Sequence, residues 1–166
     1  MASLSALSCG YSLTSALPAN FRTIYVEPLK NNITYTSDGG RNLYLPLLEV
    51  KVRNAIINRY LFDGNLKIAA PEESDLTLKG ELKRYDRGAL RYAENNQDVQ
   101  EYRVQIFVSL ELWDNHTNEL VWKEEDFVGE ATYFVTGALA KSEDAAVGDA
   151  ITDLARRIVE RTIENW

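Results

Sequence analysis

Few side chains in this sequence are of the types that carry out catalysis. His116 is the only histidine, and it lies in a polar turn between two strand-like stretches, where a lone imidazole is expected to face water. One cysteine and one histidine cannot make a zinc set, and no nucleophile elbow or phosphate-binding loop occurs. The acidic run Glu124–Asp126 reads as a solvated strand face rather than a pair of catalytic carboxylates. We therefore expect no catalytic residue, no metal ion and no cofactor.

The position of the only cysteine, Cys9, is more informative than its reactivity. A lone cysteine is most often a free or buried thiol, but Cys9 precedes every periodic segment, so no core is available to bury it. The small and apolar residues before it resemble the end of a lipoprotein signal peptide, although Ala6 replaces the usual leucine and no basic start is present. We expect residues 1–8 to be a signal remnant, Cys9 to carry lipid (palmitate among its acyl chains), and residues 9–21 to form a tether.

A cluster of cations is the second feature with chemical potential. The ten residues "KRYDRGALRY", 83–92, contain four cations and a single aspartate, interleaved with two tyrosines. The four cations are Lys83, Arg84, Arg87 and Arg91. Two interpretations stay open: an exposed strand end whose cations pair with Glu124 and Glu125 across the sheet, or an anion-binding tip for lipid phosphates or an acidic surface.

Composition restricts the functions that these residues can serve. The chain has 166 residues, 45% of them hydrophobic and 26% charged, which suits one globular domain. Its formal net charge of −7 argues against a broad nucleic-acid-binding face, so no nucleic-acid partner is expected. No run of 18 apolar residues occurs, so no transmembrane helix is predicted.

Hydrophobic periodicity supplies the elements that must position the cation cluster. Alternation predicts long strands in 75–85, 102–114 and 119–135, the clearest being "YRVQIFVSLELWD" with Ile106, Val108 and Leu110 on its buried phase. Shorter strands are predicted at 22–28 and 66–71, and the polar stretch 30–44 is predicted to be a loop.

Two helices complete the predicted fold. The first spans 45–62, and a second apolar stripe along it (Leu47, Val50, Ile57 and Leu61) predicts that this helix is covered on two sides. The last helix starts after the N-cap candidate Ser142 and runs to about Asn165. The expected fold is α+β, with two helices on one face of a four- to five-stranded, mixed but largely antiparallel sheet formed by residues 22–166.

Several of these stretches, in this order, resemble a known family. The opening Cys9-Gly10-Tyr11, then Leu17-Pro18 and "IYVEP" at 24–28, are similar to the start of the LPS-assembly lipoprotein family LptE. The strand "APEESDLTLKGEL" at 70–82 and the closing helix "SEDAAVGDAITDLARRIVERTIENW" at 142–166 also resemble that family. The similarity covers nearly the whole chain.

The resemblance implies a function without catalysis. Family members are lipid-anchored at the periplasmic face of the Gram-negative outer membrane. They partner and plug the β-barrel LptD, and they assist lipopolysaccharide assembly and bind lipopolysaccharide. Only Cys9 carries over as a family position. An alternative is a similar outer-membrane lipoprotein that activates a cell-wall synthase, which usually needs a long disordered tether; Cys9 to Phe21 reaches at most about 40 Å.

Overall fold

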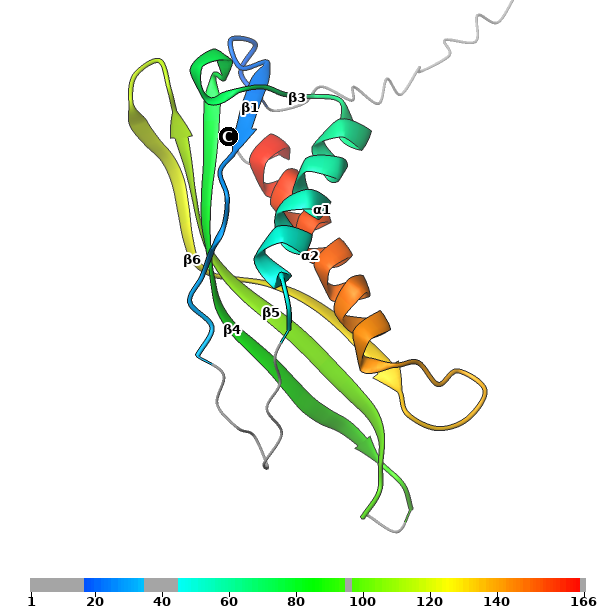
Figure 1. Cartoon of the computed structure of the whole chain (residues 1–166). Helices are drawn as coiled ribbons and strands as arrows, with labels where there is room; N and C mark the ends of the chain where they lie inside the picture. The colour runs from blue at the N-terminus through cyan, green and yellow to red at the C-terminus, as the bar shows by residue number, and fades with distance from the viewer. Residues whose placement is uncertain (1–16, 35–44, 95–96, 165–166) are drawn as a thin grey trace, which may run out of the picture.

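The computed structural model describes residues 17–34, 45–94 and 97–164. Its elements in chain order are β1 (Thr23–Val26), β2 (Lys30–Asn31), α1 (Leu48–Asp63), β3 (Lys67–Ile68), the 3₁₀ turn η1 (Pro71–Glu73), β4 (Leu76–Tyr92), β5 (Val99–Asp114), β6 (Glu119–Phe134) and α2 (Glu143–Glu164). Both helices lie on one face of a single mixed sheet (Figure 1). The predicted α+β fold is confirmed.

The sheet has six strands in the described residues, where four to five were predicted, in the order β3-β1-β4-β5-β6 with β2 beside β4. β5 pairs antiparallel with both β4 and β6. β1 pairs in parallel with β3 and β4, and β2 pairs in parallel with β4. The additional strand is β2, which was predicted to be part of a loop. Its two residues pair with Glu81 and Leu82, a long-range contact that local sequence does not encode.

The period-two pattern of β5 places its side chains as predicted. Ile106, Val108 and Leu110 are at most 1% exposed, whereas Glu111 on the other phase is only half-buried. These residues join β4 and α2 in one continuous hydrophobic core. Among the described residues, neither helix is long and apolar enough to cross a membrane.

Helix α1 differs from its prediction in two ways. It begins at Leu48 rather than Leu45, after Leu47 in a left-handed conformation, and it ends at Gly64, whose φ of 80° suits glycine. One stripe, Leu48, Val52, Ile56 and Tyr60, is buried. The prediction of a second covered side is wrong, because Leu47, Val50 and Leu61 are exposed and only Ile57 is half-buried. The helix packs on α2 and on one end of the sheet, and no described element covers its outer side.

Helix α2 is the main cover of the sheet and packs against β5 and β6. Its predicted N-cap is confirmed, since the Ser142 hydroxyl accepts a hydrogen bond from the Ala145 amide at 3.2 Å. The packing is close at Gly129 of β6, where an added Cβ would lie 2.7 Å from the Ala150 carbonyl oxygen.

The long strands give the domain two ends, which we name by what they hold. The tether pole contains Arg22, Asp75 and His116, and the described chain enters there at Leu17 (Figure 1). The far pole contains Tyr92, Val99 and Glu143. β4 has 17 residues, so the two poles lie about 50 Å apart. Phe21 is buried and Leu17 packs on the core, so both belong to the folded domain.

Candidate functional site

The cation cluster of β4 is divided between the two faces of the sheet. A register shift between Leu82 and Arg84 makes Lys83 the extra residue of a β-bulge. Simple alternation would put Lys83 and Arg87 on the same face of the sheet. The bulge shifts the alternation by one residue, so the side chains that follow Lys83 point to the face opposite to the expected one. Arg84 then lies opposite Phe107 on the face of the sheet that the helices leave uncovered, which we call the open face. Arg87 lies opposite Val104 on the helix-covered face. A second shift before Arg91 returns that side chain to the open face.

Arg87 is held by a polar cluster under the start of α2. Its guanidinium donates to the Glu143 carboxylate at 2.8 Å and lies over the Tyr102 ring, 4.3 Å from its centroid. The hydroxyls of Tyr85 and Tyr133 donate to the same carboxylate at 3.1 and 3.4 Å. Glu143 therefore occupies the place that an external anion would need in order to reach Arg87.

The ionisation of this cluster follows from its partial burial. Burial raises the pKa of the Tyr85 phenol, and the Glu143 charge raises it further. Burial also lowers the pKa of Arg87, but the hydrogen bond and charge of Glu143 outweigh that effect, so the net shift is upward. The cluster is thus a fixed ion pair with neutral phenols, which ties the first turn of α2 to β4.

The three open-face cations also have acidic partners. Lys83 lies 3.6 Å from Glu81, Arg84 2.7 Å from Asp86, and Arg91 3.7 Å from Glu101. In the described residues Glu124 and Glu125 form no ion pair with these cations; a hydrogen bond and charge from Lys123, and to a smaller degree the charge of Lys83, lower the pKa of Glu125. Glu124 pairs with Arg161 of α2, and Glu125 pairs with Lys123 beside it.

Aromatic rings beneath the cations are a feature that sequence reasoning missed. Arg84 lies 3.8 Å from the Phe107 ring centroid, Arg91 5.7 Å from that of Phe134, and Lys79 4.9 Å from that of Trp113. These three pairs form a row along the open face. The sequence did contain the signal, because Phe107 and Trp113 occupy the otherwise polar phase of β5.

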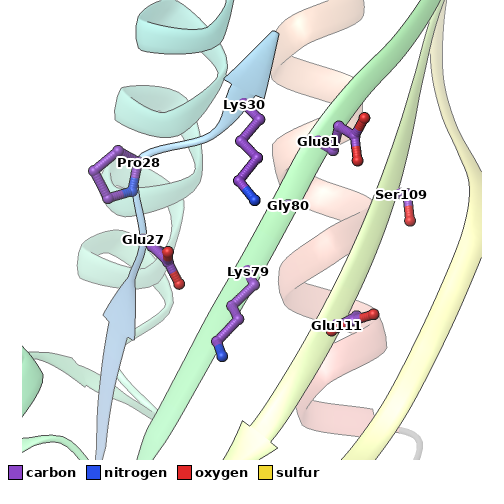
Figure 2. A pocket seen from close by; sticks show the side chains of 8 residues that line it. All are labelled: Glu27, Pro28, Lys30, Lys79, Gly80, Glu81, Ser109 and Glu111. Carbon is purple, nitrogen blue, oxygen red and sulfur yellow. The ribbon is translucent and has the colours of Figure 1, made fainter. Parts of the chain in front are cut away.

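A shallow hollow of about 170 Å³ lies on the same open face, between β4 and the segment that joins β1 to β2 (Figure 2). Its lining carries three carboxylates and two ammonium groups: Glu27, Pro28, Lys30, Lys79, Gly80, Glu81, Ser109 and Glu111. Drug-sized ligands usually fill apolar clefts of about 300–1,000 Å³. This hollow is smaller and charged, so it does not fit an acyl chain.

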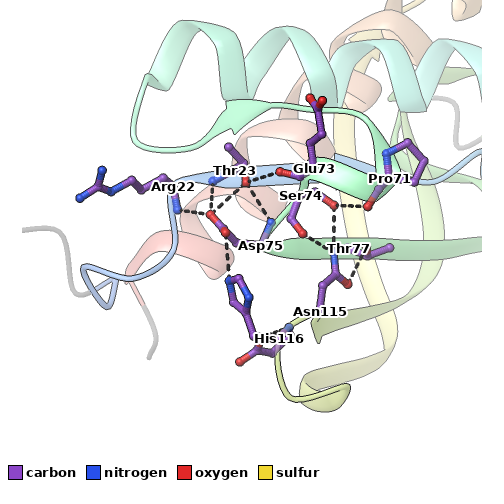
Figure 3. Close-up of polar contacts among 10 residues, drawn as sticks. Arg22, Thr23, Pro71, Glu73, Ser74, Asp75, Thr77, Asn115 and His116 are labelled. Atoms are coloured by element: carbon purple, nitrogen blue, oxygen red, sulfur yellow. Dashed lines mark hydrogen bonds and ion pairs between the residues drawn. The ribbon is translucent and has the colours of Figure 1, made fainter.

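At the tether pole, Asp75 joins its own segment to the start of β1 and to the turn between β5 and β6 (Figure 3). Its carboxylate accepts hydrogen bonds from the amides of Arg22 and Thr23 at 2.8 and 2.9 Å, and His116 Nε2 lies 3.0 Å away. Partial burial raises the pKa of Asp75, but these hydrogen bonds outweigh it and hold the pKa below its usual value. His116 thus lies in a turn as predicted, and this network serves to close the end of the fold.

A family model described as LptE, lipopolysaccharide-assembly, matches residues 21–162. The chain belongs to the LptE family. Family membership supports an outer-membrane lipoprotein of the lipopolysaccharide-assembly type. No curated protein matches the sequence.

Three solved structures with a similar fold have low sequence identity to the LptE-family chain. A PelC dodecamer from Paraburkholderia phytofirmans is 15% identical, with a TM-score of 0.53 over 90% of this chain and 95% of that one. A Xanthomonas campestris protein is 12% identical, with a TM-score of 0.55 over 85% and 83% of the two chains. A hypothetical protein from Chlamydia trachomatis is 13% identical, with a TM-score of 0.56 over 85% and 95%. At these identities the likeness concerns the fold alone.

The structure describes four of the five residues that the sequence singled out as candidate site residues. Cys9 lies outside the described residues, so its lipidation stays a prediction. The structure brings Lys83, Arg84 and Arg91 onto the open face and separates Arg87 from them. Within the described part of the chain, no cluster of His, Cys, Asp or Glu is arranged to hold a metal ion.

Proposed function

We propose that this LptE-family chain is an outer-membrane lipoprotein, acylated at Cys9 and facing the periplasm, that works without catalysis. In this proposal it partners and plugs an LptD-like β-barrel and assists lipopolysaccharide assembly at the outer-membrane surface. The family match across residues 21–162 supports this class of function. The shape and polarity of the domain support the role of a plug.

The observation that carries the proposal is the length of the sheet together with its polar open face. A strand of about 50 Å exceeds the about 40–45 Å of a bilayer with its headgroups. Large outer-membrane barrels have polar interiors, which match a face of ion pairs such as Lys123 with Glu111 and Arg84 with Asp86. A domain held lengthwise in such a barrel, with its tether pole at the periplasmic side, would bring the far pole to the level of the outer leaflet.

The far pole also has the composition that an anionic amphiphile requires. Exposed Leu90 and Tyr92 flank Arg91 in β4, and the Arg91 side chain is 62% exposed. Lipopolysaccharide combines phosphate groups with acyl chains, so it can use both kinds of side chain. We assign its contacts to Lys83, Arg84 and Arg91, whereas Arg87 is engaged by Glu143.

Purification from solubilised outer membranes tests this function. A tagged chain expressed with a complete signal peptide should co-purify with a β-barrel protein in fixed ratio. Cys9→Ala should release the protein to the periplasm without unfolding it. A chain that fractionates with the outer membrane but elutes without a barrel would contradict the plug role, and a cell-wall synthase in the eluate would favour the alternative function.

A further inference from the structure

The end of α1 carries an exposed apolar pair that no described element covers. Leu61 is 62% exposed and Phe62 is 82% exposed, and the two are adjacent in the last turn before Gly64. Single exposed apolar side chains are common, but here a phenylalanine and the leucine before it are both exposed at the same helix end.

A cation accompanies this pair. The Arg59 guanidinium lies 5.4 Å from the Phe62 ring centroid. Within the described residues Arg59 makes no ion pair, and its buried Nε has no hydrogen-bond partner. Arg59 therefore differs from Arg84, Arg87 and Arg91, each of which has a carboxylate beside it.

The pair lies at the tether pole. Shortly after Phe62, the Lys67 amide donates to the Arg22 carbonyl, and β3 pairs with the start of β1 (Figure 1). The chain enters the domain at the same end, at Leu17. A lipid on Cys9 would stand at most about 28 Å from Leu17, because an extended chain covers about 3.3–3.6 Å per residue. Acylation of Cys9, as proposed above, would therefore hold this pole beside the bilayer.

We propose that Leu61, Phe62 and Arg59 form an interfacial anchor that contacts the phospholipid surface. The two apolar side chains enter the boundary between headgroups and acyl chains, and the Arg59 guanidinium donates hydrogen bonds to a lipid phosphate. This inference rests on the proposed function for the side on which the membrane lies. The anchor adds a second attachment beside the acylated cysteine and fixes the angle at which the domain stands.

Vesicle partitioning of the full chain carrying Cys9→Ala tests the anchor without the acyl chains. The probe is a phosphatidylcholine vesicle at millimolar lipid, and the readout is the fraction of protein that sediments with it. Leu61→Ser with Phe62→Ser should lower the partition coefficient at least about tenfold, because both apolar burials are lost. Arg59→Gln should lower it about threefold. Binding of the parent should persist at about 0.5 M salt, since the apolar contact is not screened.

The matched control is Leu139→Ser. Leu139 is 74% exposed but lies before α2 at the far pole, so its loss should leave partitioning within about twofold of the parent. The proposal fails if the parent binds vesicles no better than the double variant, or if Leu139→Ser loses as much as the double variant. Intact-mass analysis of the lipidated protein tests Cys9 separately, so a failed anchor at α1 and a failed acylation site give different results.

Discussion

Removing the Glu143 carboxylate tests how the far pole is held to the helix layer. Glu143→Ala leaves Arg87 without its ion-pair partner and leaves the Tyr85 hydroxyl without its acceptor. The two charged side chains are 24% and 19% exposed, so the pair lies between the surface and the buried case. Exposed pairs contribute about 0.2–1 kcal/mol, and breaking a buried pair costs about 3–5 kcal/mol. We expect Glu143→Ala to lower the free energy of unfolding by about 2–3 kcal/mol.

Thermal and urea unfolding of purified, unlipidated protein measure this loss. For a chain of this length, about 2–4 °C of Tm corresponds to each kcal/mol, so Tm should fall by about 5–10 °C. Asp144→Ala is the matched control, because Asp144 lies in the same first turn but is exposed. Asp144 has in common with Glu143 only the interaction with the helix dipole, which contributes about 0.3–1 kcal/mol. Equal losses in the two variants would refute the reasoning, because the dipole alone would then explain the effect.

Three further predictions test other parts of the account. Gly129→Ala should lower the free energy of unfolding, measured in urea, by at least about 3 kcal/mol, because the added Cβ would lie 2.7 Å from the Leu154 Cα and would push β6 and α2 apart. A loss below about 1 kcal/mol would contradict the close packing of β6 on α2. The pKa of Asp75 in the folded protein is below its value near 3.9 in the unfolded chain. This carboxylate therefore stabilises the fold at pH values above about 3.9, and its contribution is lost as pH falls through the folded pKa. Asp75→Asn should therefore make the free energy of unfolding depend less steeply on pH in the acid range. An unchanged pH dependence would show that other groups cause the acid unfolding. Arg84→Glu with Arg91→Glu should weaken lipopolysaccharide binding at least about tenfold while Tm changes little, and unaltered affinity would remove the open-face cations from the binding surface.

The sequence predicted those parts of the fold that depend on local periodicity. Strand β5 and helix α2 were placed correctly because each buries one regular stripe, such as Val147, Ile151, Leu154 and Ile158 of α2. The same logic failed for α1. Its second apolar stripe was read as a buried face, but periodicity cannot distinguish a side covered by the chain itself from one left exposed.

The candidate site was predicted only in part, because a single bulge decides it. Composition identified the four cations of β4, but period-two alternation assigns Arg87 to the wrong face once Lys83 is inserted as an extra residue. The bulge depends on how β4 pairs with β5, which is a long-range property. Pairing also selects Glu143, distant in sequence, as the partner of Arg87, whereas Glu124 and Glu125 find partners of their own.

Site-specific crosslinking in cells tests the central claim, that the domain fits inside a barrel, most directly. Glu125 lies on the open face of the sheet and its side chain is 64% exposed, so a photo-crosslinking residue there should not disturb the fold. The account predicts a crosslink from this position to an LptD-like β-barrel in intact outer membranes. A protein that reaches the outer membrane in normal amount but gives no barrel crosslink from this position would contradict it.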